Sequence, residues 1–282
     1  MTPAQRAERE RAAAAANQKH RELKRGRHGA RIELPIRDGC IVIFSDAHWW
    51  PHEESIANKA LLYLLPKLKP WCVVNNGDSF DGASISRFPR IGWDSRPSVV
   101  EELKANEDRL GEIKDACKGL GVMWYIWNVG NHDARYETFL ASRVPEYHGV
   151  SGFALKERFP DWLPAWSTWI GDQAVIKHRM KGGLYAAANN ALHAGRTIVT
   201  SHDHALYYKA FTDYNGTRWG VDTGTLADVW GPQFKDYTED HSVNWQSGFA
   251  ILHFRDGKCT GPELVHALPD GRAVFRGELL NV

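Results

Sequence analysis

Acidic, imidazole and amide side chains gather at the ends of the apolar runs of this sequence. The groups are Asp46-Ala-His48, Gly77-Asp-Ser-Phe-Asp81, Gly130-Asn-His-Asp133, His178 and Ser201-His-Asp-His204. Carboxylate and imidazole ligands without thiolate suit Mn, Fe, Zn or Ni in a hydrolytic centre, and they argue against electron-transfer copper and iron-sulfur sites. The pattern therefore indicates a hydrolytic metal site.

Each group follows a stretch with the pattern of a buried strand. Short apolar runs at 40–44, 71–74 and 122–127 alternate with helix patterns at 53–68 and 98–117. Alternation of this kind is typical of a right-handed parallel layer, in which ligands bind outside the carboxyl ends of the strands. We therefore expect the groups to converge on one crevice.

The second half of the chain has a different texture. Short strand patterns recur at 174–178, 196–200, 217–221, 248–255 and 272–275, with few helices between them. They predict a second, mixed sheet packed on the first. We expect an α/β fold with one catalytic domain over 32–282, preceded by a basic, Ala-rich arm over 1–31 that is helical or disordered.

Composition limits the class of protein. Of 282 residues, 43% are hydrophobic and 24% are charged, which is typical of a globular chain. We find no run of about 18 apolar residues and no secretory signal. We therefore expect a cytoplasmic protein without a membrane partner. Its four widely separated cysteines, Cys40, Cys72, Cys117 and Cys259, are expected to be structural.

The five groups, taken in order, are similar to the motifs of the calcineurin-like metallophosphoesterases. That family has Asp-x-His, Gly-Asp-x-x-Asp, Gly-Asn-His-Asp/Glu, a lone His and Gly-His-x-His. The resemblance spans about 41–204 and leaves the N-terminal arm outside. It implies a four-layer α-β-β-α sandwich of two mixed sheets, with a dinuclear metal site at the strand ends.

The resemblance also implies roles for individual residues. A first divalent ion would be held by Asp46, His48, Asp78 and His204, and a second by the bridging Asp78 with Asn131, His178 and His202. Mn²⁺ is the ion we expect, with Fe, Zn or Ni as alternatives. His132 would contact the substrate, and Asp133 would orient it.

Two positions depart from the family pattern. Arg179 follows His178 where the family usually has glycine, and Ser201 replaces the glycine before His202. Glycine at such places commonly permits a tight backbone or a close approach. His178 is therefore the predicted ligand whose surroundings differ most from the family pattern.

The ligand set implies a mechanism without a Ser or Cys nucleophile. Two cations acidify a bridging water to hydroxide, which attacks the phosphorus in line with the leaving oxygen. His132 protonates that oxygen, a role that needs a pKa near the working pH. Asn131, Arg135 and Arg179 are expected to help the metals neutralise the other phosphoryl oxygens.

Charge suggests the substrate. Residues 1–31 carry a net charge of +6, which leaves −5 for the rest of a chain with a net charge of +1. Such an arm can tether nucleic acid, because Lys and Arg contacts to phosphate give sequence-independent affinity. A solvated helical tail or a contact between subunits of a homo-oligomer explains the same charges.

A polar loop at 82–97 supplies a candidate substrate rim. Its substrate-binding candidates are Arg87, Arg90, Arg96 and Trp93, and Trp49 and Trp50 are further aromatic residues that we expect to be exposed. Cationic grooves with stacking rings hold single strands. We therefore expect a nuclease or phosphodiesterase acting on nucleic acid. The alternative is a small-molecule phosphomonoesterase or cyclic-nucleotide phosphodiesterase, and a non-catalytic, metal-bound scaffold is more remote.

Overall fold

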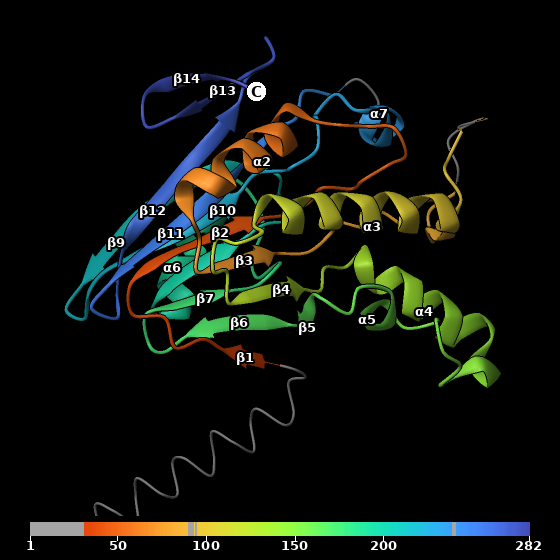
Figure 1. The fold of residues 1–282 in the computed structure, drawn as a ribbon, viewed down its shortest axis with the longest axis horizontal. Coiled ribbons are helices and arrows are strands. Elements are labelled where there is room, and N and C mark those ends of the chain that lie inside the picture. The colour runs from red at the N-terminus through yellow and green to blue at the C-terminus, as the bar shows by residue number, and fades with distance from the viewer. Residues whose placement is uncertain (1–30, 90–92, 94, 239–240) are drawn as a thin grey trace, which may run out of the picture.

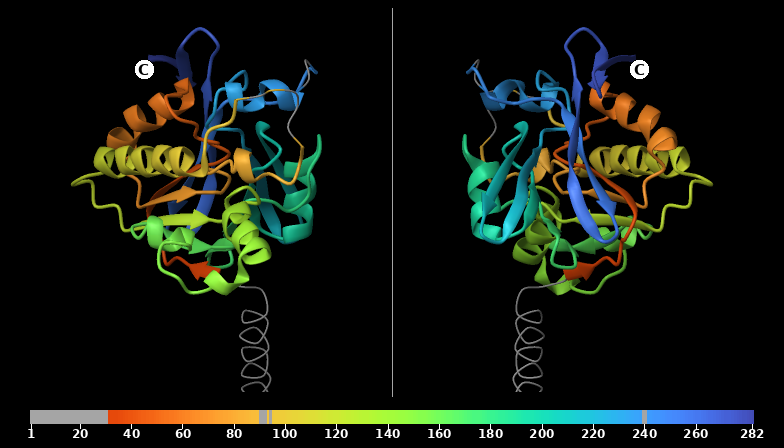
Figure 2. Two further views of the ribbon diagram at one scale, coloured as in Figure 1. Left: turned by 90° about the vertical axis from the view of Figure 1, so that its right-hand side faces the viewer. Right: turned by 90° about the vertical axis from the view of Figure 1, so that its left-hand side faces the viewer.

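Two mixed β-sheets face each other in this chain (Figure 1). The computed structural model describes residues 31–89, 93, 95–238 and 241–282. The predicted arm therefore lies outside the described residues, except for Arg31, which begins β1. Figure 2 shows the layers edge-on, with helices on the outer side of each sheet. The expected sandwich of two mixed sheets is confirmed.

The larger sheet carries the first three motifs. Its order is β14-β13-β12-β11-β2-β3-β4-β5, and β2, β3, β4 and β5 run parallel. Its strands are β2 (Gly39–Phe44), β3 (Cys72–Asn75), β4 (Trp124–Asn128), β5 (Leu163–Ala165), β11 (Gly248–Arg255), β12 (Lys258–Ala267), β13 (Arg272–Phe275) and β14 (Glu278–Asn281). The carboxyl ends of β2, β3 and β4 thus lie at one edge.

The smaller sheet carries the remaining motifs. Its order is β1-β6-β7-β8-β10-β9, and β7, β8 and β10 run parallel. Its strands are β1 (Arg31–Glu33), β6 (Ser167–Ile170), β7 (Ala174–Ile176), β8 (Thr197–Thr200), β9 (Leu206–Asp213) and β10 (Gly216–Thr223). His178 follows β7, and His202 and His204 follow β8, at matching ends.

Three helices cover the outer faces of the sheets. On the larger sheet lie α2 (Ile56–Leu68), capped by Ser55, and α3 (Val99–Ala116), which begins with a capping box between Ser98 and Glu101. On the smaller sheet lies α6 (Ala186–Ala194), which packs on β8, β9 and β10. Leu61, Leu65 and Leu110 pack against the outer face of the larger sheet.

An apolar core fills the space between the two sheets. Ile41 and Ile43 of β2 meet Ile176 of β7 and Val199 of β8 there. Because side chains alternate along a strand, Val42 and Phe44 of β2 face the helices instead. Burial on both faces explains why the β2 segment reads as a continuous apolar run.

Shorter elements surround the edge where the motifs meet. They are η1 (Ala83–Ile85), α4 (Asp133–Arg143), η2 (Pro145–Tyr147), α5 (Leu155–Arg158) and α7 (Pro232–Thr238). Among the described residues, no helix combines the length and apolarity that crossing a membrane requires. The four cysteines are free thiols, and three of them are buried.

Candidate metal centre

The predicted ligands meet in two adjoining clusters at the strand ends. The Asp46 cluster consists of Asp46, His48 and His204, and the Asp78 cluster consists of Asp78, His178 and His202. In each cluster the candidate ligand atoms lie within 4.8 Å of one another. A third group, His48, Asp78 and His132, meets the same criterion and joins the two clusters.

Backbone conformation marks these residues as unusual. Among the described residues, nine non-glycine residues have positive φ, and five of them are the predicted ligands Asp46, His48, Asp78, His202 and His204. Left-handed backbone costs about 1 kcal/mol or more for such residues and persists only where the surroundings impose it. The fold therefore holds these side chains inward at a cost to stability.

Two motif glycines are required by close packing. A Cβ atom at Gly130 would lie 2.1 Å from Asp78 Oδ1, and one at Gly77 would lie 2.7 Å from His178 Nδ1. Any side chain at either position would displace a predicted ligand. The glycines thus allow the second, third and fourth motifs to approach each other.

The clusters contain buried polar atoms that form no hydrogen bond. Within the described residues these include Asp46 Oδ1, His48 Nε2, His178 Nε2 and His204 Nδ1. Although His178 Nε2 lies only 3.0 Å from Asp78 Oδ2, this pair lacks hydrogen-bond geometry. Buried unpaired polar atoms are expensive unless an ion binds them, so the donor set fits divalent metal ions.

The surroundings of the two cluster carboxylates favour their ionised form. Burial alone would raise the pKa of Asp46 and of Asp78, but the neighbouring imidazoles outweigh it and hold both pKa values below the usual range. His204 acts chiefly on Asp46, and His178 acts chiefly on Asp78. Ionised carboxylates are the form that metal binding requires.

Ser201 explains one departure from the family pattern. Its hydroxyl lies 3.1 Å from His178 Nδ1 and donates to the His178 carbonyl oxygen at 3.0 Å. His178 Nδ1 also lies 2.8 Å from the Asn76 carbonyl oxygen, which fixes a proton on Nδ1 and leaves Nε2 free toward Asp78. Serine at this position therefore supports His178 in the orientation of a ligand.

Asp81 connects the first and third motifs. Its carboxylate accepts hydrogen bonds from His48 Nδ1 at 3.2 Å, from His132 Nδ1 at 2.8 Å and from the Trp50 indole at 3.2 Å. A bond on Nδ1 orients each imidazole and leaves its Nε2 toward the site. Asp81 was missing from the predicted site residues, although the Gly-Asp-x-x-Asp motif contained the signal for it.

Asp133 does not orient His132, which corrects the sequence prediction. Its buried carboxylate accepts the backbone N–H groups of Asp78, Ser79, Phe80 and Gly130 and the indole N–H of Trp127, at 2.8 to 3.1 Å. Asp133 therefore ties the loop of Asp78 to the loop of His132. The side-chain partner of His132 is Asp81.

His132 stands at the N-terminus of α4, beside both clusters. Its Nε2 lies 4.0 Å from Asp78 Oδ2 and 3.0 Å from a terminal nitrogen of Arg135. Burial lowers the pKa of His132, but Asp78 and Asp81 outweigh burial and raise it. Because Arg135 can only donate, Nε2 holds a lone pair in this arrangement and Nδ1 holds the proton.

The predicted substrate contacts are placed unevenly. Arg179 donates to Asn131 Oδ1 at 3.4 Å, and Arg135 lies beside His132. Arg87 is exposed, whereas Arg96 donates to the Ala83 carbonyl oxygen within its own loop.

The three tryptophans that were predicted to be exposed differ in their exposure. Trp93 is fully exposed, but Trp49 is buried, contrary to the prediction, and Trp50 is half-buried. Trp50 is also occupied, because its indole donates to Asp81. Arg90 lies outside the described residues.

An aromatic wall, consisting of Phe234 and Trp245, covers the outer side of the Asp46 cluster. The Phe234 ring lies 5.3 Å from both the His48 and His204 rings, and the Trp245 ring lies 4.6 Å from His204. Phe234 belongs to α7 and is 5% exposed. This wall could not be predicted from the sequence, because nothing in the local pattern links these rings to the motifs.

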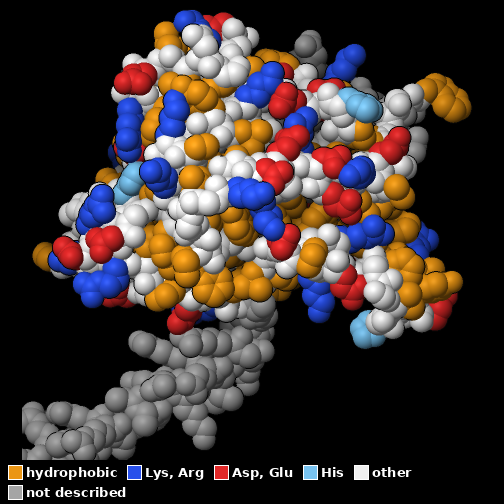
Figure 3. Space-filling model, viewed as in Figure 1, with side chains coloured by type: hydrophobic (Ala, Val, Ile, Leu, Met, Phe, Trp, Pro, Cys, Tyr) orange, Lys and Arg blue, Asp and Glu red, His pale blue; other side chains and the backbone are white. Residues whose placement is uncertain are grey.

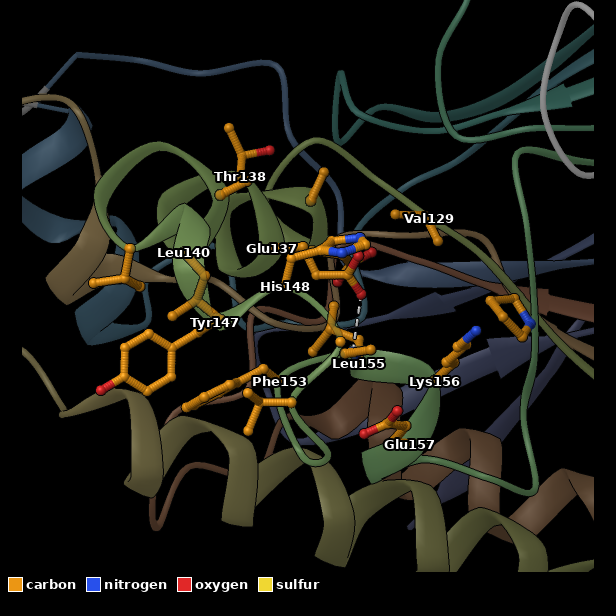
Figure 4. A pocket seen from close by; sticks show the side chains of 18 of the residues that line it. Val129, Glu137, Thr138, Leu140, Tyr147, His148, Phe153, Leu155, Lys156 and Glu157 are labelled. Atoms are coloured by element: carbon orange, nitrogen blue, oxygen red, sulfur yellow. Dashed lines mark hydrogen bonds between the residues drawn. The ribbon is translucent and has the colours of Figure 1, made fainter.

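A separate cavity of about 870 Å³ lies beside α4 (Figure 4). It is bounded by α4, η2, α5 and the β5 region, and its wall includes Leu140, Phe153 and Leu155. Asp133 is the member of this wall that also binds the loop of Asp78. None of the predicted metal ligands lines it, so this cavity is distinct from the candidate metal centre.

The order of motifs, the two facing sheets and the meeting of the motifs at their strand ends are those that the sequence resemblance implied. The chain resembles the calcineurin-like metallophosphoesterases in fold and in motif placement. No protein-family model matches the chain. The gene 54 protein of Mycobacterium phage L5 is 25% identical over 270 residues, covering 86% of this chain and 98% of the phage protein.

Solved structures give remote likenesses. The phosphoesterase YfcE from E. coli is 13% identical with a TM-score of 0.36, over 79% of this chain and 97% of that one. A Pseudomonas putida nuclease, MPE, is 10% identical with a TM-score of 0.35, over 78% and 86%. A dimetal phosphatase from Danio rerio is 12% identical with a TM-score of 0.34, over 88% and 98%. Likenesses with TM-scores this low do not indicate the function of this chain, so the evidence for its function is the geometry of the site.

Proposed function

We propose that this chain is a metal-dependent phosphoesterase that hydrolyses phosphodiester bonds of nucleic acid. The observation that carries the proposal is the pair of clusters on either side of His132, with buried ligand atoms left without hydrogen bonds. Two divalent ions in such a site supply a hydroxide nucleophile at neutral pH and polarise the phosphoryl oxygens. Mn²⁺ is the ion that we propose, with Fe, Zn and Ni as alternatives.

The residues around the two clusters have distinct proposed roles. Asp78 belongs to one cluster and also shares the joining group with His48 of the other, so it is the candidate bridge. Asn131 would add an amide oxygen to the Asp78 cluster, as the resemblance implies. His132 is the proposed acid: Arg135 contacts its Nε2 in this structure. When Arg135 binds the substrate instead, Nε2 would take up a proton from solvent and give it to the leaving oxygen. Asp81 keeps the imidazole in place through Nδ1.

Support for nucleic acid comes from the position of the cations. Arg135, Arg179 and Arg87 lie around the motif edge, and Trp93 is exposed on the adjoining loop. By contrast, basic and acidic side chains alternate on the face over α2 and α3 (Figure 3). A strand that crosses the motif edge would meet cations and aromatic rings, as single-strand binding requires.

The first test is metal content together with a substrate screen. Purified protein is expected to contain close to two transition-metal ions per chain and to lose activity in chelator. Asp78→Asn is expected to lose both metal and rate, whereas Asp256→Asn is the matched control, because Asp256 is exposed and also has positive φ. Full activity in metal-free protein contradicts the proposal.

The screen compares single- and double-stranded DNA, RNA, a chromogenic diester and a chromogenic monoester with Mn²⁺. Faster cleavage of polynucleotides supports the nuclease. Hydrolysis of monoesters alone assigns the site to the second candidate, a phosphomonoesterase. Bound metal without hydrolysis of any ester supports the remaining alternative, a non-catalytic, metal-bound scaffold.

A further inference from the structure

The loop between β7 and α6 is fixed at two points. Asn190, which is fully buried in α6, accepts the backbone N–H of Lys181 at 3.0 Å and donates to the Lys181 carbonyl oxygen at 3.0 Å. The backbone N–H of Gly183 donates to Asp203 Oδ2 at 2.9 Å. A loop of this length can connect a strand to a helix without such bonds. The bonds of Asn190 and Asp203 therefore indicate that the shape of this loop serves a function.

Asp203 ties this loop to the metal centre. It lies between the predicted ligands His202 and His204, and a Cβ atom at Gly182 would come within 2.8 Å of its Oδ1. The loop therefore packs directly on the segment that carries two ligands. Any shift of that segment would move the loop with it.

Arg179 precedes the fixed part of the loop and follows His178. Its guanidinium donates to Asn131 Oδ1 at 3.4 Å, and the side chain is exposed. Asn131 Oδ1 is the atom that the resemblance gives to the second ion. When an ion takes this oxygen, the donors of Arg179 remain at the mouth of the Asp78 cluster without that partner.

A guanidinium at this mouth matches one chemical class of ligand. Its planar donors bind phosphate oxygens with directional, charge-assisted hydrogen bonds. Arginine at the position where the family usually has glycine thus adds a fixed anion-binding group to the site.

We propose that Arg179 binds a non-bridging oxygen of the substrate phosphate, and that Asn190 and Asp203 are positioning residues that hold the 179–183 loop for this contact. The proposal rests on the phosphoesterase function proposed above. Its ligands are phosphate esters and the inorganic phosphate ion, which presents the same oxygens.

The test uses the metal-loaded, full-length protein and inorganic phosphate as the probe. Calorimetry is expected to show phosphate binding weakened roughly 10- to 100-fold in Arg179→Gln, the worth of a hydrogen bond to a charged group. Arg179→Lys is expected to recover part of the loss. Arg255→Gln is the matched control, because Arg255 is exposed and lies far from the motifs. It ends β11, next to the first residues of β2, whereas the Asp46 motif follows the last residue of β2.

Hydrolysis of a chromogenic diester gives an independent readout. Guanidinium ion added to Arg179→Gln is expected to restore part of kcat, because it supplies the missing donor, and to leave the wild type unchanged. A structural role for Arg179 would show no such rescue. Metal content, measured for every variant, is expected to stay at the wild-type value.

The positioning residues are tested through loop protection. In Asp203→Ala, amide hydrogen exchange at Gly183, whose N–H donates to Asp203, is expected to accelerate and phosphate binding to weaken. Asp203→Asn retains an oxygen acceptor and is expected to preserve both. Wild-type phosphate affinity in a fully metallated Arg179→Gln overturns this inference alone. Absence of metal-dependent hydrolysis in the wild type overturns the proposed function instead.

Discussion

Asp81 Oδ1 accepts hydrogen bonds from both His48 and His132, at 3.2 and 2.8 Å, so one carboxylate oxygen joins a predicted metal ligand to the predicted acid catalyst. The His48 and His132 rings lie 4.7 Å apart and nearly perpendicular. Orientation of the ligand and orientation of the acid therefore depend on the same side chain. Loss of Asp81 has to affect metal binding and proton transfer together.

The first prediction concerns this shared oxygen. Asp81→Asn keeps the size of the side chain but removes its charge, and it is expected to weaken metal binding by about 10- to 100-fold, the usual effect of losing a partner behind a ligand. At saturating metal, kcat is expected to remain low, because His132 stays misaligned. Metal titration and kinetics at saturating metal separate the two effects. Full recovery of kcat by added metal would show that Asp81 serves His48 alone.

The second prediction separates the acid from the ligands. His132→Ala is expected to keep its metal content and to lose roughly 10² to 10⁴ in kcat, the usual contribution of general acid catalysis. The defect is expected to shrink for a diester with a good leaving group, because such an oxygen needs little protonation. An empty metal site in His132→Ala would instead make His132 a ligand, in line with its place beside His48 and Asp78.

The third prediction tests the aromatic wall. Phe234→Ala removes the ring that contacts both His48 and His204, so water gains access to two imidazoles and their orientation loosens. Metal binding is expected to weaken by about 10-fold, as for other supports behind a ligand. Phe139→Ala is the control, because Phe139 is 39% exposed on α4. Equal metal affinity in both variants would show that the aromatic wall contributes to packing and not to metal binding.

The sequence predicted the strands that end in the motifs because these strands are buried on both faces. The runs at 40–44 and 71–74 became β2 (Gly39–Phe44) and β3 (Cys72–Asn75) with shifts of one residue at their ends. Their lack of polar residues reflects contact with helices on one side and with the second sheet on the other. Polar residues then follow because the chain leaves the core there.

Other elements were missed because their local patterns are weak. The helix α6 has alanine and asparagine on its buried face, without the periodic large apolar residues that indicate a helix, and it packs closely over Gly220. The edge strand β9 exposes much of its length, so it lacks a clear alternation of apolar and polar residues. Tertiary packing, which the sequence pattern does not encode locally, stabilises both.

Within the site, spacing indicated which residues gather but not how they pair. Asp133 follows His132 directly in its motif, whereas Asp81 ends the preceding motif, and it is Asp81 that pairs with the His132 ring. The carboxylate of Asp133 is taken up by backbone N–H groups that only the folded loops bring together. The contact between Ser201 and His178 was also not predictable from spacing, because the pairing of β7 with β8 brings the Ser201 hydroxyl next to the His178 ring.

The last prediction concerns the N-terminal arm as a tether for nucleic acid. Residues 1–30 contain eight Lys and Arg and three Glu, and their removal leaves β1, which begins at Arg31, and every predicted metal ligand intact. Each phosphate that the arm neutralises adds about 0.9 to the slope of log affinity against log salt on duplex DNA, or about 0.7 on a single strand. Polynucleotide binding by the truncated protein is therefore expected to weaken and its salt dependence to flatten by several units.

The reference for this truncation is a small chromogenic diester, which lacks the flanking phosphates of a polynucleotide that the arm would neutralise. Its hydrolysis is expected to stay nearly unchanged, because the arm holds none of the site residues and the described fold begins after it. Comparison of salt slopes for full-length and truncated protein on one oligonucleotide then isolates the contribution of the arm from that of the arginines at the site. Identical slopes would assign the arm to a subunit contact or a solvated tail, and would leave Arg135 and Arg179 as the cations that a nucleic-acid strand meets first.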